Sequence, residues 1–194
     1  MKFAASFSGG KDSTLAIKRM LDEGKEVVAL IVSTKKGQGQ SWTHNLDKKY
    51  FQEVARILGA EVFFTESGVE DYEALFEEAL RESKVIGAEA CIFGDIDIEG
   101  HLDWNRKRCA GAGLACLHPL EYEDRRAILE EFLDTGLEAR IVKVNTDYLD
   151  ESFIGRLLDR SLLEELSSYK GLDLCGENGE YHTRVDQESI EKNI

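Results

Sequence analysis

The chain has 194 residues, of which 42% are hydrophobic and 32% charged, a composition typical of a globular protein of one domain. Its formal net charge of −14 disfavours nucleic acid as a partner, because binding a phosphate backbone requires clustered lysines and arginines. No apolar run approaches the roughly 18 residues that cross a membrane, and the first residues lack the cationic and apolar regions of a signal peptide. We therefore expect a cytoplasmic protein with no membrane partner.

Apolar strand-like runs alternate along the chain with amphipathic helix-like segments, which is typical of a parallel α/β sheet. The predicted strands are 3–7, 26–33, 61–65, 90–94, 114–117 and 139–144. The predicted helices are 14–21, 46–58, 72–85, 104–112, 125–135 and 153–168. Residues 172–185 are expected to form a hairpin that turns at Asn178-Gly179, a pair that favours tight turns. We predict an α/β fold, with a doubly wound, mostly parallel sheet of five or six strands and a small C-terminal hairpin, in a single domain over residues 1–194.

In a doubly wound sheet, ligands bind beyond the carboxyl ends of the strands, at the point where the strand order reverses. The segments that follow the first, second, fourth and sixth predicted strands are therefore expected to face one cleft. These segments are 8–13, 33–41, 94–100 and 145–152.

The segment SGGKDS lies between the first predicted strand and the first predicted helix. Two glycines allow the backbone to turn sharply and to bring its N–H groups close to an anion. The unpaired amides and the dipole of the new helix add positive potential, and Lys11 adds a full charge. The segment is not a Walker loop, because aspartate follows the lysine where that loop has serine or threonine. The residues that we predict to bind phosphate are Ser8, Gly9, Gly10, Lys11, Asp12 and Ser13.

Acidic residues follow the fourth predicted strand, in the sequence GDIDIEGH. Asp95 comes directly after the strand and is expected to point into the cleft, as a catalytic residue and, with Asp12, as a ligand of Mg²⁺. In an extended conformation Asp95, Asp97 and Glu99 would share one face. For Asp97 and Glu99 we favour a solvated acidic loop.

Three further positions are candidates for nucleotide binding. Ser33 and Gly94 lie at the carboxyl ends of the second and fourth predicted strands. His44 lies at the entry to the second predicted helix, where contact with a nucleotide and simple surface exposure are equally good interpretations. Trp42 beside it is expected to cover the loop rather than to stack on a ring.

The segment CGENGEYHT near the C-terminus gathers two carboxylates, a phenol, an imidazole and a hydroxyl around a predicted turn. Such carboxylates could capture ammonium, with Glu180 or His182 taking its proton. Alone, the segment is more simply interpreted as a polar terminal hairpin. The candidate substrate-binding residues are Glu177, Asn178, Glu180, His182 and Thr183.

SGGKDS resembles the PP-loop of the N-type ATP pyrophosphatases, a resemblance that implies cleavage of ATP between the α- and β-phosphates. Four motifs in one order, SGGKDS, GDI, LDESFIGR and GENGEYHT, make nearly the whole chain similar to the diphthine–ammonia ligase family. The resemblance implies that ATP adenylates a substrate carboxylate and that ammonia displaces AMP to give an amide. By this resemblance Ser8–Ser13 match the pyrophosphate loop, and Glu177, Glu180 and Thr183 match a substrate or ammonia motif within residues 172–185. We expect Lys11, Asp95 and Glu180 to be catalytic, and ATP and Mg²⁺ to be required.

The chain departs from this family on the presumed substrate side. The family pattern has tryptophan at the position of Glu121, and glycine and glutamate where Asn178 and His182 stand. The departures favour a short, divergent branch, which leaves open whether the acceptor is a protein or a small-molecule carboxylate, such as a corrinoid acid. A homodimer is compatible with the sequence.

Two other functions remain open at this point. One is thiolation of tRNA, which the acidic charge and the absence of Cys-x-x-Cys pairs oppose. The other is a non-catalytic module that binds ATP or AMP.

Overall fold

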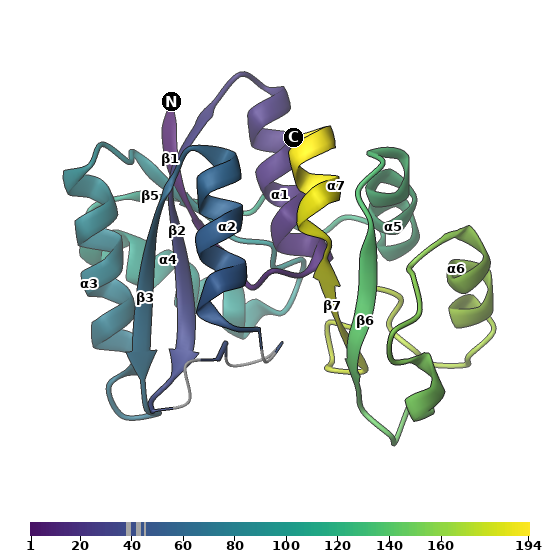
Figure 1. Cartoon of the computed structure of the whole chain (residues 1–194). Coiled ribbons are helices and arrows are strands. Elements are labelled where there is room, and N and C mark those ends of the chain that lie inside the picture. Colours follow the sequence, from purple (N-terminus) through teal and green to yellow (C-terminus); the bar gives the residue numbers. More distant parts are fainter. Residues whose placement is uncertain (38–39, 42–43, 45) are drawn as a thin grey trace.

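The computed structural model describes residues 1–37, 40–41, 44 and 46–194, and its centre is a five-stranded parallel sheet (Figure 1). The strand order is β3-β2-β1-β4-β5, so the chain winds outward from β1 to β3 and then returns to the other side of β1. The strands are β1 (Lys2–Ser6), β2 (Glu26–Lys35), β3 (Glu61–Ser67), β4 (Ala90–Ile92) and β5 (Ala115–Leu117). The predicted doubly wound α/β fold is confirmed.

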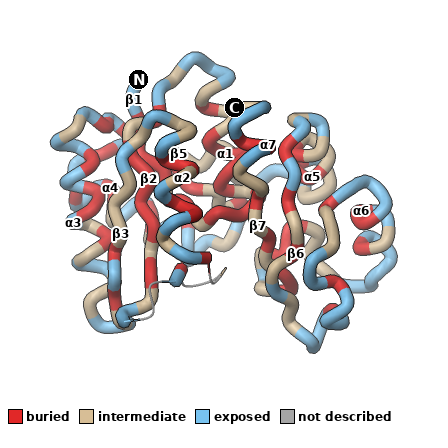
Figure 2. Tube along the Cα trace, viewed as in Figure 1, coloured by how far each residue is buried: buried red, intermediate tan, exposed pale blue. Residues whose placement is uncertain are grey.

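Helices cover both faces of this sheet. The helices are α1 (Lys11–Asp22) and α2 (Lys48–Leu58) on one face, and α3 (Tyr72–Val85) and α4 (Glu99–Ala112) on the other. Strand residues alternate between the two faces as the pleat requires: Phe3 and Ala5 of β1 pack with α1 and α2, whereas Ala4 packs with α3 and α4. Figure 2 shows that buried residues run along β1 and β2, where both faces are covered. None of the described helices is long and apolar enough to cross a membrane.

A second, two-stranded antiparallel sheet lies beside α1 and pairs β6 (Ala139–Val144) with β7 (Tyr181–Val185). The sixth predicted strand therefore does not extend the parallel sheet. The expected antiparallel element is present, but its two strands are far apart in sequence, and residues 172–180 form turns rather than the first arm of a hairpin. The remaining helices are α5 (Arg125–Asp134), η1 (Glu151–Phe153), α6 (Arg160–Ser167) and α7 (Gln187–Asn193). Their apolar side chains join those of α1 and α2 in one core cluster.

Two helices begin five or more residues away from their predicted positions. α4 begins at Glu99, five residues early, because a carboxylate in the first turn favours the helix dipole and does not prevent a helix. α6 begins only at Arg160, where the Asp159 side chain accepts a hydrogen bond from Leu162 N at 2.8 Å. Before it, Leu158 N donates to Ala139 O, so this part of the chain runs extended along β6.

Candidate functional site

A cavity of about 260 Å³ lies at the carboxyl ends of β1 and β4, where the strand order reverses. This is the position at which doubly wound sheets bind ligands. Its wall consists of the glycine turn after β1, His44, the segment after β4, and residues of the 175–183 segment. Segments from the two ends of the chain thus share one cavity.

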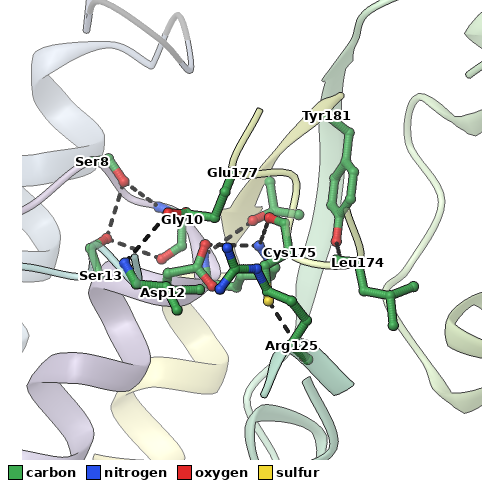
Figure 3. A network of polar contacts seen from close by, with 12 residues as sticks. Ser8, Gly10, Asp12, Ser13, Arg125, Leu174, Cys175, Glu177 and Tyr181 are labelled. Atoms are coloured by element: carbon green, nitrogen blue, oxygen red, sulfur yellow. Dashed lines mark hydrogen bonds and ion pairs between the residues drawn. The ribbon is translucent and has the colours of Figure 1, made fainter. Parts of the chain in front are cut away.

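The glycine turn after β1 is held by its two serines (Figure 3). The hydroxyls of Ser8 and Ser13 lie 3.1 Å apart, Gly10 N donates to Ser8 Oγ at 3.3 Å, and Ser13 Oγ donates to Gly10 O at 3.1 Å. Helix α1 begins directly after Gly10, at the wall of the cavity. The backbone amides of Asp12 and Ser13 in its first turn and the helix dipole place positive potential there, as anion binding requires.

Two glycines, Gly9 in the turn and Gly94 after β4, allow neighbouring groups to pack closely against the turn. Gly9 has φ +83°, and a Cβ atom there would lie 2.6 Å from Leu46 Cδ1 and 2.9 Å from Tyr50 Cε1. At Gly94, which follows β4, a Cβ atom would lie 2.7 Å from the backbone nitrogen of Ser13. Gly9 does not line the cavity, but any side chain at Gly9 or Gly94 would displace the turn.

Lys11 joins the turn to the C-terminal segment. Its backbone N–H donates to Thr183 Oγ1 at 3.1 Å, and its ammonium donates to Asp12 Oδ2 at 2.8 Å and to Cys175 O at 2.5 Å. The side chain is only 3% exposed, and its Nζ lies 5.2 Å from the centre of the Tyr181 ring. Burial lowers the pKa of Lys11, but the Asp12 carboxylate together with the neighbouring Tyr181 and Cys175 outweighs this effect, and the pKa is raised above its ordinary value. The lysine is therefore a permanent cation at the cavity wall.

The carboxyl group of Glu177 also lines the cavity, and its Oε2 accepts a hydrogen bond from Ile96 N at 3.4 Å. Burial, and then the neighbouring Asp12 and Asp95 carboxylates, raise the pKa of Glu177 to about 7. Such a group both binds and releases a proton near neutral pH.

Two imidazoles, His44 and His182, line another part of the wall, with ring centroids 4.9 Å apart. His44 Nδ1 lies 2.6 Å from Thr183 O, so this nitrogen carries a proton that it donates. Burial, followed by the neighbouring His182, lowers the pKa of His44 to about 3, and burial, followed by Lys143, lowers that of His182 to about 4. Both rings are neutral at pH 7.

Several predicted site residues lie away from the cavity. Ser33 Oγ contacts Thr65 Oγ1 and the Tyr72 hydroxyl instead. Glu180 is 1% exposed, and its carboxylate accepts backbone hydrogen bonds from Asp173 and Asn178, both at 3.1 Å. Asn178, Glu180 and the 145–152 segment do not line the cavity.

The shared acidic face that an extended conformation would have given Asp95, Asp97 and Glu99 does not form. Asp97 pairs with Arg125 at 2.6 Å, and Glu99, in the first turn of α4, accepts a hydrogen bond from Tyr122. Asp95 alone of the three lines the cavity, as expected. Trp42 lies outside the described residues.

Sequence reasoning missed His101 in the cavity wall and Asn105 behind it. His101 approaches Asp95 with Nδ1 3.3 Å from Oδ1, and Asn105 donates from Nδ2 to Asp95 Oδ2 at 2.9 Å. The four-residue spacing of His101 and Asn105 would have placed both on one helical face had α4 been predicted to begin at Glu99. Cys175 and Tyr181 also line the cavity; both lie in the segment CGENGEYHT, but neither was among the candidate binding residues.

Among the described residues no group of three or more histidine, cysteine or acidic side chains could by itself hold a metal ion. Asp12 and Asp95 nevertheless line the same cavity, and Asp12 Oδ1 is buried with no hydrogen-bond partner in the part of the chain that the structure describes. This donor set fits Mg²⁺ in its usual nucleotide-bound form, in which one or two carboxylates act together with phosphate oxygens and water.

Comparison with known proteins places the chain in a family. Residues 1–116 match the diphthamide synthase N-terminal domain, and residues 124–193 match the diphthamide synthase C-terminal domain. The human protein diphthine–ammonia ligase is 27% identical over 94% of this chain and 78% of its own length. The Saccharomyces cerevisiae protein of the same name is 28% identical over 95% of this chain and 33% of its own length.

A solved structure shares the fold. It is described as a predicted subunit of a tRNA methyltransferase from Methanocaldococcus jannaschii, and it matches with a TM-score of 0.51 and 20% identity over 96% of this chain and 97% of that one. At this identity the likeness shows the fold alone. The family models, together matching nearly the whole sequence, show more: the chain belongs to the diphthamide synthase family.

Proposed function

We propose that the protein is an ATP-dependent amide ligase that adenylates a substrate carboxylate, releases pyrophosphate and transfers ammonia to the acyl group with release of AMP. One observation carries the proposal: the phosphate-binding turn and the C-terminal segment line the same cavity and are joined through Lys11. Diphthine–ammonia ligases of other organisms match nearly the whole chain and support a ligase. We propose that residues 1–194 form a single domain that carries this function.

In the first step an oxygen of the substrate carboxylate attacks the α-phosphorus of ATP, and the bond between that phosphorus and the bridging oxygen to the β-phosphate breaks. Negative charge then develops on pyrophosphate. The amides at the start of α1 and the Lys11 ammonium are placed to stabilise it. Mg²⁺, held through Asp12 and Asp95, would supply further charge neutralisation on the phosphate oxygens.

In the second step the nitrogen of ammonia attacks the acyl carbon, and AMP leaves with the electrons of the broken carbon–oxygen bond. Ammonia is mostly ammonium at neutral pH, so a group in the cavity must accept a proton. Glu177 suits this role better than the predicted Glu180, because Glu177 lines the cavity whereas both Glu180 oxygens accept backbone hydrogen bonds. The neutral His44 and His182 are proposed to contact nucleotide and substrate, respectively.

The proposal is tested by measuring pyrophosphate release from ATP and Mg²⁺ with panels of carboxylic acids, with and without ammonium. With an acid alone we expect at most one pyrophosphate per protein molecule, because the acyl-adenylate is consumed only by ammonia, and we expect repeated turnover when ammonium is also present. We expect Lys11→Ala to lower kcat/KM for ATP by about 100-fold or more, as loss of a charge-stabilising donor does. Lys170→Ala, at an exposed position, is the matched control. ATP binding without pyrophosphate release for any acid would instead identify a nucleotide-binding module without ligase activity.

A further inference from the structure

A buried polar network lies behind Asp95. Asn105, on α4, is 4% exposed, and its Nδ2 donates to Asp95 Oδ2 at 2.9 Å and also lies 3.1 Å from His118 Nε2. The other oxygen of Asp95 faces His101 Nδ1 at 3.3 Å. Asp95 is therefore contacted at both oxygens by side chains one helical turn apart.

The orientation of the Asn105 amide follows from these contacts. Its NH₂ group has two protons, one available for Asp95 and one for His118, whereas a reversed amide would set its oxygen against the Asp95 carboxylate. His118 Nε2 must then be the unprotonated nitrogen of a neutral ring, with the proton on Nδ1. That nitrogen faces Glu121 Oε2 at 3.7 Å.

His118 itself has little freedom to move. Its side chain is 2% exposed, and its ring lies 5.5 Å from that of Phe93, with the planes tilted by 33°. Glu121, which faces its Nδ1, is in turn paired with Arg106. The network thus runs from a surface ion pair through His118 and Asn105 to the cavity.

We infer that Asn105, held in place by His118, is a positioning residue that fixes the Asp95 carboxylate for its role in the cavity. The inference rests on the proposed function, because Asp95 acts there on nucleotide and Mg²⁺. Partners that orient a ligating carboxylate typically contribute 10- to 100-fold to metal affinity or activity. Asn105→Ala and Asn105→Asp are accordingly expected to lower kcat for pyrophosphate release by 10- to 100-fold, with KM for the acid unchanged.

The control is Asn193→Ala, which removes an asparagine on α7 that is hydrogen-bonded to backbone carbonyls away from the cavity. Its kcat should match that of the unaltered protein. A double-mutant cycle with Asp95 distinguishes a positioning role for Asn105 from a merely structural one. If Asn105 acts through Asp95, then Asn105→Ala has no further effect on kcat once Asp95 is alanine, and additive effects overturn the inference.

A second readout needs no activity. In NMR spectra of the free, ¹⁵N-labelled protein, Asp95→Ala should shift one side-chain amide proton of Asn105, and His118→Ala should shift the other. If neither moves, the positioning network is refuted. If both move while the unaltered protein releases no pyrophosphate, the network stands and the proposed ligase function fails.

Discussion

At Gly94 the end of β4 approaches the first turn of α1 so closely that a Cβ atom would meet backbone, 2.7 Å from Ser13 N and 2.8 Å from Asp12 C. Backbone cannot rotate away as a flexible side chain can. We expect Gly94→Ala to destabilise the protein by about 1–3 kcal/mol, the usual cost of overpacking, and to weaken ATP binding. Gly100→Ala is the control, because nothing lies within 4 Å of its Cβ position and alanine favours a helix by about 0.5–1 kcal/mol. Equal unfolding midpoints in urea for the two variants would contradict this account.

Glu177 predicts a pH dependence of stability. Burial and nearby carboxylates raise its pKa from 4.5 to about 7 in the folded protein. Between these values the folded chain binds a proton that the unfolded chain does not, so this group makes stability fall as pH rises from about 4.5 to 7. The loss amounts to at most about 3 kcal/mol, since one pKa unit corresponds to 1.36 kcal/mol.

Glu177→Gln should therefore be more stable than the unaltered protein at pH 8 and lose the difference at pH 4. Urea unfolding across this range measures it. Glu61→Gln, at an exposed position on β3, should leave the curve nearly unchanged. A Glu177→Gln curve parallel to that of the unaltered protein would show that folding leaves the pKa of this carboxyl unchanged.

The buried Thr183 attaches strand β7 to the glycine turn after β1, and the buried Thr34 on β2 serves as a comparison. Thr183 Oγ1 accepts the Lys11 N–H, whereas Thr34 Oγ1 is buried without a hydrogen-bond partner among the described residues. Valine keeps the shape of threonine and removes only the hydroxyl function. Thr183→Val should cost about 1–3 kcal/mol because it leaves a buried N–H unpaired, and Thr34→Val should be neutral or stabilising. Urea unfolding of both variants checks this, and a greater loss at Thr34 would be incompatible with the pairing described.

Elements whose partners are near in sequence could be predicted from local patterns. The alternation of apolar residues and the glycine turn were enough to locate β1, α1 and the position of the cavity. The β6–β7 pairing could not be predicted in this way, because it joins strands separated by more than 30 residues. Asn178-Gly179 has the sequence of a hairpin turn. In the structure, however, the backbone amides of Asp173 and Asn178 donate hydrogen bonds to the buried Glu180 carboxylate.

The same dependence on nearby sequence explains which residues of the site could be predicted. Ser8–Ser13 and Asp95 were predictable because each directly follows a strand. His101 and Asn105 were not, because their roles depend on where α4 begins and on a partner that the sequence alone does not place.

At the scale of the whole molecule, the C-terminal third completes the hydrophobic core around α1. Leu15 on α1 belongs to the same core cluster as Phe132 on α5 and Val185 on β7. Polar contacts also join the region around α1 to the C-terminal third. The Arg19 guanidinium pairs with Glu131 at 2.5 Å, and Val185 N donates to Gly9 O at 2.9 Å. The glycine turn after β1 therefore depends on segments from both ends of the chain.

A fragment of residues 1–116, the part that matches the family's N-terminal domain, should consequently not fold cooperatively alone. It retains the parallel sheet but exposes apolar side chains of α1 that in the intact protein belong to one core cluster with those of α5, β7 and α7. We expect a broad thermal transition by circular dichroism, fast amide exchange in α1 and binding of a hydrophobic dye, whereas the whole chain unfolds in one sharp step. Co-expression with residues 117–194 should restore slow exchange in α1. A fragment that melts sharply, within a few degrees of the whole chain, would instead show that the parallel sheet is stable without the segments that complete its site.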